Sequence, residues 1–206
     1  MRKTRGAVLL LAGLLLAGFF LVGLAGCGKT VKRVETSDVI DLSGRWNDTD
    51  SRLVAEEMVQ DALSRPWLED FRDARGARPV VIVGTVRNRS TEHINTQTFV
   101  KDLERSLLNS GRVDFVASRI EREEIREERK DQAVYSSEET AKEHGREIGA
   151  DFMLQGSINT IEDREGGKMV RFYQVNLELV NLETNRKAWI GEKQIKKFIS
   201  RSRLGP

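Results

Sequence analysis

The sequence is poor in the residues that most often carry out chemistry. It has one cysteine, Cys27, and two histidines, His93 and His144, among 206 residues. A single cysteine excludes a disulfide within the chain and a thiolate metal cluster, and neither histidine stands at metal-ligand spacing from a second histidine or a carboxylate pair. Gly-x-Ser-x-Gly, Ser-x-x-Lys and phosphate-cradling glycine motifs are also missing. We therefore predict no catalytic residue, no metal site and no cofactor, and a protein that is not an enzyme.

Basic and acidic residues are also nearly balanced in number. The chain carries 34 basic and 32 acidic residues, and three of the basic ones, Arg2, Lys3 and Arg5, precede a hydrophobic run that we expect to be removed. A charge balance close to neutral argues against nucleic-acid binding as the main function. We expect no nucleic-acid partner.

The one long hydrophobic run lies at the amino terminus. Residues 6–26 carry no charge and follow the basic head, which is the layout of an export signal. The run ends in Leu24-Ala25-Gly26-Cys27, which resembles the lipobox of bacterial lipoproteins. The resemblance implies cleavage before Cys27, a diacylglyceryl thioether on its sulfur and a further acyl chain on the new amino terminus, enough for stable membrane anchoring.

A plain transmembrane anchor is the alternative for this run, because its length is enough to span a bilayer. Under the lipoprotein interpretation, Gly28 stands where an aspartate would hold the protein in the inner membrane of a Gram-negative cell. We therefore expect a location in the outer membrane, lipid-anchored and facing the periplasm.

Four segments follow from this interpretation. Residues 1–26 are the predicted signal peptide, residues 27–45 the lipidated cysteine and a short polar tether, residues 46–200 one globular periplasmic domain, and residues 201–206 a basic tail. Seventeen tether residues from Gly28 to Gly44 reach at most about 60 Å when fully extended. The length of the remainder suits a single hydrophobic core.

Helical spacing of apolar residues predicts helices in the first half of the domain. The first starts at a cap provided by Thr49 or Asp50, and a second, capped by Ser64, closes at Gly76. A third is capped by Asn95 or Thr96 and stops at residues 109–111. Its predicted inner face holds Phe99, Val100, Leu103, Leu107 and Leu108.

Two more helices are predicted after Ser118, which forms a capping box with Glu121. The first carries a dense charge run, residues 119–131, which is either a solvated face or an acidic and basic docking strip. The second spans about residues 136–149.

Strands are predicted where apolar residues run together or alternate. Residues 79–86 form a short buried strand that ends in a polar loop at residues 87–90, and residues 113–116 form another. Three longer strands cover residues 152–158, 169–180 and 188–195, joined by turns at Gly166-Gly167 and residues 182–186. Trp46 is expected to pack, and residues 196–203 to be a frayed basic end. We predict an α/β (α+β) sandwich, a mixed sheet of about four to five strands packed with helices.

Several local strings in this order resemble LpoB-type lipoprotein activators of penicillin-binding proteins. They are Ser43-Gly44-Arg45-Trp46-Asn47-Asp48, Val80–Val86 with Asn88-Arg89-Ser90, Asn109-Ser110-Gly111, Ile148–Leu154, and Leu182-Glu183-Thr184 with Trp189. The resemblance implies a fold like the amino-terminal domain of TolB. It also implies a regulatory activity: docking on a noncatalytic module of a murein synthase and raising its output in peptidoglycan synthesis. It marks no docking residue.

The tether differs from the long Pro-rich linker that such activators can carry. This difference leaves a second interpretation, a structural outer-membrane lipoprotein of an envelope assembly or curli-type secretion pore. The first interpretation predicts a monomer bound to a penicillin-binding protein, and the second predicts a ring.

Overall fold

The computed structural model describes residues 30–135 and 147–200. Contacts divide the chain into two units, residues 1–38 and residues 39–206. In the first unit, residues 30–38 are exposed and form no helix or strand. All helices and strands named below belong to the second unit.

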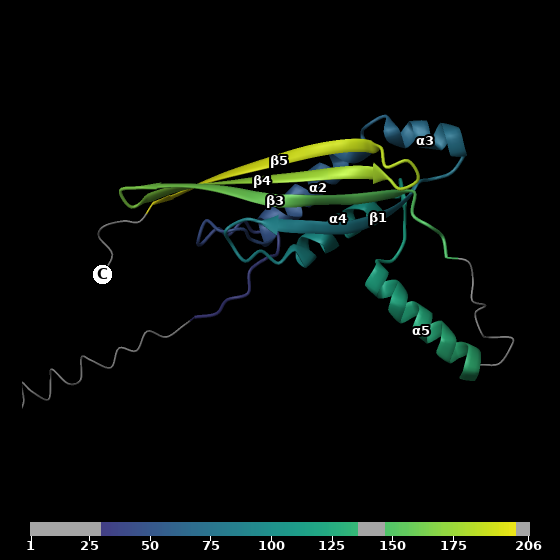
Figure 1. Ribbon diagram of the computed structural model, residues 1–206. Coiled ribbons are helices and arrows are strands. Elements are labelled where there is room, and N and C mark those ends of the chain that lie inside the picture. The colour runs from purple at the N-terminus through teal and green to yellow at the C-terminus, as the bar shows by residue number, and fades with distance from the viewer. Residues whose placement is uncertain (1–29, 136–146, 201–206) are drawn as a thin grey trace, which may run out of the picture. The chain divides into compact units, whose positions relative to one another are not determined.

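A mixed sheet of five strands is the centre of the second unit, as Figure 1 shows. In sheet order the strands are β2 (Asp114–Phe115), β1 (Val80–Arg89), β3 (Phe152–Glu165), β4 (Lys168–Asn181) and β5 (Lys187–Ser200). β1 runs parallel to β2 and to β3, whereas β3, β4 and β5 form an antiparallel meander. The predicted mixed sheet and the α+β class are confirmed.

In the described residues, four helices accompany the sheet: α2 (Asp48–Leu63), α3 (Trp67–Arg75), α4 (Thr96–Asn109) and α5 (Arg119–Tyr135). α2 and α4 contact each other, and they lie on the same face of the sheet, α2 against β5 and α4 against β1. They lie behind the strands in Figure 1. α2 buries a stripe of apolar residues at helical spacing, which is why this helix packs along one side only.

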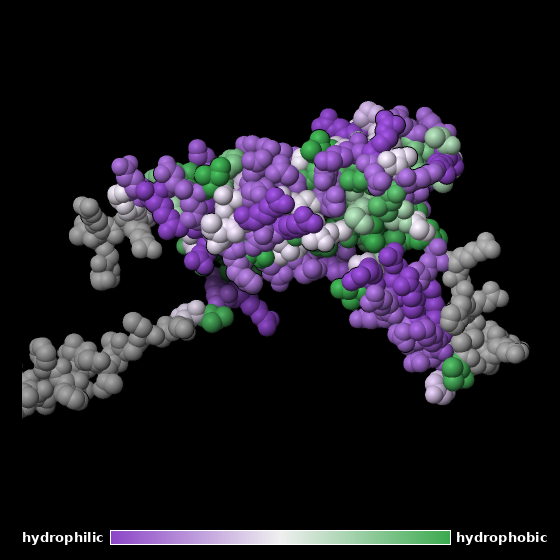
Figure 2. Space-filling view, in the orientation of Figure 1, coloured by the Kyte–Doolittle hydropathy of each residue, from purple (hydrophilic) through white to green (hydrophobic). Residues whose placement is uncertain are grey.

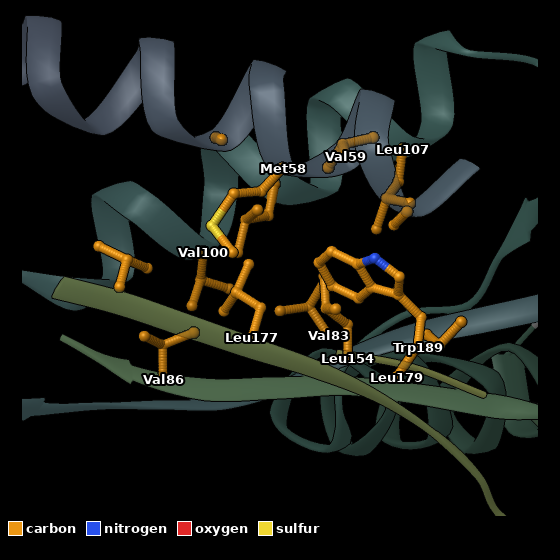
Figure 3. Close-up of a cluster of buried hydrophobic side chains, with 14 of the residues drawn as sticks. Met58, Val59, Val83, Val86, Val100, Leu107, Leu154, Leu177, Leu179 and Trp189 are labelled. Atoms are coloured by element: carbon orange, nitrogen blue, oxygen red, sulfur yellow. The ribbon is translucent and has the colours of Figure 1, made fainter. Parts of the chain in front are cut away.

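The core fills the space between these two helices and the sheet. In Figure 3, Met58 and Val59 of α2 and Val100 and Leu107 of α4 point toward the strands. The side chains that meet them are Val83, Val86, Leu154, Leu177, Leu179 and Trp189. Alternate residues of a strand point to opposite faces, so only one side of each strand of the meander contributes to this core.

Two helix starts differ from the sequence prediction. Asn47, and neither Thr49 nor Asp50, caps α2: its side chain accepts a hydrogen bond from the Asp50 amide, while the Asp50 carboxylate accepts one from the Asn47 amide. Ser64 ends α2, and α3 starts after Pro66 without any side-chain cap. In place of a side-chain cap, the Arg65 carbonyl accepts a hydrogen bond from the Leu68 amide of the first turn, at 3.4 Å.

Three other segments also differ from the prediction. Residues 87–89, predicted as a loop, continue β1, because their backbone pairs with residues 157–159 of β3. Residues 196–200, predicted as a frayed end, complete β5 by pairing with β4. Leu108, predicted on the inner face of α4, is 57% exposed.

The predicted turns are confirmed. Gly166 and Gly167 join β3 to β4 and both have positive φ, which glycine adopts without steric cost. Residues 182–186 join β4 to β5, with Asn185 in the left-handed region. The predicted helix at residues 136–149 lies mostly outside the described residues, and residues 147–149 are not helical.

Candidate partner-binding surface

The sheet has one face that α2 and α4 do not cover. We call it the open face, and it consists of the side chains on β3, β4 and β5 that alternate with the core residues. From the strand register, its main members are Met153, Gln155, Ser157, Asn159, Ile161, Phe172, Gln174, Asn176, Glu178, Ile190, Glu192, Gln194, Lys196 and Phe198. Arg87 and Arg89 of β1 extend it, since they pair in register with Ser157 and Asn159.

Amide side chains dominate the middle of the open face. The Gln174 amide donates a hydrogen bond to Glu192 at 2.7 Å and another to Asn176 at 3.3 Å, and Gln155 donates to Glu178 at 3.3 Å. These bonds run within and between neighbouring strands, so they hold the amides in a fixed array. Fixed donors and acceptors on a rigid sheet suit specific recognition of a partner surface.

A shallow hollow of about 400 Å³ lies over part of this array, and its lining includes Arg87, Arg89 and Glu178, whose carboxylate already pairs with Lys187. Both arginines are exposed, and within residues 30–135 and 147–200 neither forms an ion pair. A guanidinium can bind a carboxylate through two parallel hydrogen bonds. The hollow is therefore suited to a partner that presents acidic side chains.

An apolar patch adjoins the array near the β3–β4 turn. Ile161 lies directly opposite Phe172, and Val170 directly opposite Phe198. Ile161 and Phe198 are 67% and 65% exposed. Exposed apolar side chains that gather on one surface and are surrounded by polar groups are typical of interaction sites.

Below this patch, on the helix-covered face, lies a buried charge network. Arg171 of β4 contacts Glu92 at 2.6 Å and Glu162 at 2.7 Å, and it donates a hydrogen bond to the Gly44 carbonyl at 2.9 Å. Glu92 in turn accepts hydrogen bonds from the Tyr173 hydroxyl and from the backbone amide of Trp46. Each buried charge thus has partners, which is the condition for keeping it inside a protein.

The network shifts the pKa values of its members. Hydrogen bonds from Arg164 and then from Arg171 hold the pKa of Glu162 below its usual range, although partial burial opposes this shift. Burial, reinforced by the Glu92 carboxylate, raises the pKa of the Tyr173 phenol. At neutral pH, Glu162 is therefore ionised and Tyr173 is a neutral donor.

A second cation, Lys197, whose side chain is only 10% exposed, completes the attachment of residues 41–46 to the sheet. Its amine lies 2.7 Å from Asp41 and 2.6 Å from Asp50, and it donates to the Arg45 carbonyl. Burial disfavours the charged amine, but the two carboxylates outweigh it and raise the pKa of Lys197. Residues 41–45, predicted as the end of a free tether, therefore pack against β4 and β5.

Trp46 packs as predicted. Its ring contacts Phe99 and Tyr173 edge-on, with ring centroids 6.0 Å and 5.5 Å away. The tryptophan therefore joins the start of α2 to both the sheet and α4.

The charge run of α5 forms a solvated helix. Figure 2 shows the surface of α5 as almost entirely hydrophilic. Several of its charges are paired: Glu121 with Lys101, Arg126 with Glu147 and Lys130 with Glu127. The capping box of Ser118 and Glu121 is confirmed.

The cysteine and the two histidines are the remaining candidate site residues. Cys27 and His144 lie outside the described residues, and His93 is exposed in a loop. Within residues 30–135 and 147–200, no three His, Cys, Asp or Glu side chains are placed to hold a metal ion. Over the same ranges, none of the helices combines the length and the apolar character needed to cross a membrane.

The open face and the buried network were not predicted from the sequence. The sequence did contain a signal for the network. Arg171, Tyr173 and Val175 are alternate residues of β4, so their side chains point to the same, inward face of the sheet. Its partners could not be found in this way, because Glu92 lies in a loop far away in the sequence.

Comparison with known proteins gives one family and several solved structures. The family model described as peptidoglycan-synthase activator LpoB matches residues 50–195. Among curated proteins, none matches the chain by sequence.

Solved structures similar to this chain include the LpoB C-terminal domain from Escherichia coli, at 18% identity and a TM-score of 0.45, covering 72% of this chain and 99% of that one. The NMR structure of E. coli LpoB has 15% identity and a TM-score of 0.41, covering 84% and 87%. Lipoprotein GNA1162 from Neisseria meningitidis has 12% identity and a TM-score of 0.36, covering 62% and 88%.

Proposed function

The chain belongs to the LpoB family of peptidoglycan-synthase activators, and from this membership we propose that it binds and activates a bifunctional penicillin-binding protein without being an enzyme itself. The observation that carries the proposal is the family match over residues 50–195, from α2 to β5. The match covers nearly all of the helices and strands, so it concerns the folded domain as a whole.

The proposal includes a lipid anchor at Cys27. In it, residues 1–26 are a signal peptide, residues 27–45 the lipidated cysteine and tether, residues 46–200 the periplasmic domain and residues 201–206 a basic tail, with the protein on the periplasmic side of the outer membrane. Because residues 41–45 pack on the sheet, the free part of the tether is shorter than the whole segment.

A palmitate analogue added to growing cells tests the anchor. We expect label on the wild-type protein and none on a Cys27→Ser variant, which should also keep the uncleaved Met1 end. An unlabelled wild-type protein would contradict lipidation without bearing on the activator role.

In this proposal, the protein activates the synthase by binding its active conformation more tightly than its inactive one. An activator shifts a synthase only by its preference for the active conformation, and a coupling of about 1–3 kcal/mol changes the output about 5–150-fold. No side chain of the activator needs to take part in the reaction. One copy of the domain suffices for this mode of activation.

The open face is the surface we assign to the synthase. It joins exposed arginines, a fixed array of amides and an apolar patch on one side of a rigid sheet, and this combination resembles the polar and apolar mixture of protein interfaces. Arg87 and Arg89 would bind carboxylates of the synthase module, and Ile161 and Phe172 would be buried beside them.

Charge reversal on the open face tests this assignment. With a purified bifunctional penicillin-binding protein from the same organism, we expect Arg89→Glu to weaken binding about tenfold or more and to lower glycan polymerisation in proportion. Arg52→Glu is the matched control, because Arg52 lies on α2, on the other side of the sheet.

The outcomes separate the surface from the function. Equal loss in both variants would contradict the assignment of the open face. A wild-type protein that neither binds the synthase nor changes its rate would refute the activator role itself.

A further inference from the structure

β5 lies at one edge of the sheet and is 14 residues long, whereas the strand at the opposite edge, β2, has only two residues. Within the described part of the chain, no strand pairs with the outer side of β5. The backbone amides and carbonyls on that side form a row that can pair with another strand.

Inward-pointing charges are one of the devices by which native proteins protect such an edge. β5 has two lysines on the helix-covered face, but both are already neutralised within the chain. Lys193 contacts Glu57, and Lys197 contacts Asp41 and Asp50. These lysines therefore present no bare positive charge against an incoming strand.

The open-face side chains of β5 are arranged symmetrically about Gln194. The residues two positions before and two positions after Gln194 are Glu192 and Lys196, which carry opposite charges. The residues four positions before and four positions after Gln194 are the large apolar Ile190 and Phe198, which are 68% and 65% exposed. If a second copy of β5 pairs antiparallel to the first about Gln194, each charged side chain faces the opposite charge and each apolar side chain faces an apolar one.

We propose that two copies of this chain pair through β5, antiparallel and with Gln194 opposite Gln194 of the partner subunit. In this register, Glu192 faces Lys196 of the partner subunit and Ile190 faces Phe198 of the partner subunit, each pair occurring twice by symmetry. Opposite charges and apolar side chains directly across two antiparallel strands stabilise their pairing.

Neighbouring registers lose this match. Centring the pairing on Lys193 sets Ile190 against Lys196 and Glu192 against Gln194. Centring it on Ile195 sets Glu192 against Phe198. The pattern therefore selects one register, which joins two five-stranded sheets into one sheet of ten.

The pairing leaves Arg87, Arg89 and the polar array of each copy on the same continuous open face. Anchoring to a membrane would favour it, because confinement raises the effective concentration of one copy for the other. The inference goes beyond the proposed activator role and replaces the monomer expected from the sequence with a pair of copies, whose contacts need no synthase.

Thiol crosslinking of the full chain in membrane vesicles tests the proposal. Gln194→Cys is the reporter, since Cβ atoms of directly opposed residues lie about 5 Å apart. Gln174→Cys is the matched control: Gln174 is the same residue type, on the same face and in the same cross-strand row, but one strand further in. Its two copies would be separated by about three strand spacings, about 14 Å.

With a short bis-maleimide, we expect a dimer band at least about tenfold stronger for Gln194→Cys than for Gln174→Cys. Cys27 is common to both variants, and the proposed lipid anchor converts its thiol to a thioether, which does not react with a maleimide. Bands of equal strength would overturn the proposal, as would an adduct of Gln194→Cys with a protein of another mass in place of the dimer.

A charge swap tests the register. In the Gln194→Cys background, Lys196→Glu places two pairs of like charges across the interface, and we expect the dimer band to fall about tenfold. Adding Glu192→Lys reverses both pairs and should restore the band. Failure of the double variant to recover, while its fold is retained by circular dichroism, would overturn the proposed register.

Discussion

Replacing Arg171 with methionine removes a buried guanidinium and keeps a side chain of similar length. The Arg171 and Glu92 side chains are only 5% and 8% exposed, and their closest atoms are 2.6 Å apart. In the variant, the Glu92 carboxylate stays buried without a cation, and the Gly44 carbonyl loses its donor.

Removing one partner of a buried ion pair typically costs about 3–5 kcal/mol, because the other charge remains desolvated. We expect Arg171→Met to lower the free energy of unfolding by about 4 kcal/mol at pH 7. For a domain of this size, about 2–4 °C of melting temperature corresponds to each kcal/mol, so the midpoint should fall by about 8–16 °C.

Urea denaturation followed by tryptophan fluorescence measures this loss, since Trp46 contacts the network through its backbone amide and lies against Tyr173. Arg164→Met is the control: Arg164 also pairs with Glu162, but its side chain is 64% exposed, so we expect a change within about 0.5 kcal/mol.

A double variant isolates the pair itself. Glu92→Gln together with Arg171→Met removes both charges, and we expect its loss of stability to be smaller than the sum of the two single losses by about 0.5–3 kcal/mol. Our reasoning would be refuted if Arg171→Met stayed within about 0.5 kcal/mol of the wild type, or if the two single losses were simply additive.

Two further predictions concern other parts of the domain. Hydrogen bonding to Lys101 lowers the pKa of Glu121 to about 2, against about 4.3 in an unfolded chain, so the stability it contributes is present above about pH 4.3 and is lost as the pH falls toward 2. The difference in urea midpoint between wild type and Glu121→Gln should therefore shrink between pH 6 and pH 2.5, and a constant difference would contradict this. Gly156→Ala would place a Cβ 2.0 Å from the Asn176 carbonyl oxygen, so we expect a loss of about 1–3 kcal/mol by urea denaturation, whereas Gly149→Ala, with no atom within 4 Å, should change little.

Most helices and strands could be predicted from the sequence because their signals are local. The apolar spacing of α2 and α4 and the alternation along β3 and β4 reflect contacts with one packed face, and the Gly166-Gly167 turn reflects backbone freedom. The α2 cap was missed because Asn47, Thr49 and Asp50 are all capping residue types within three positions, and the choice depends on where the chain enters the helix.

The extent of β1 and β5 could not be predicted in the same way. Residues 87–89 and 196–200 are polar or mixed, as is typical of loops and chain ends, yet they lie in the sheet because an adjacent strand satisfies their backbone groups. Pairing of this kind depends on the neighbour and not on the composition of the segment.

Taken by itself, the sequence determined the α+β class, the order of most helices and strands, the lack of a recognisable catalytic motif and the resemblance to synthase activators. Each of these depends on residue types at short separations. Only the tertiary structure decided that α2 and α4 leave one face of the sheet open, that Glu92 and Glu162 meet Arg171, and that β5 is an edge. These features arise when segments far apart in the chain pack together, because burial and strand pairing are set by whichever segments meet in space.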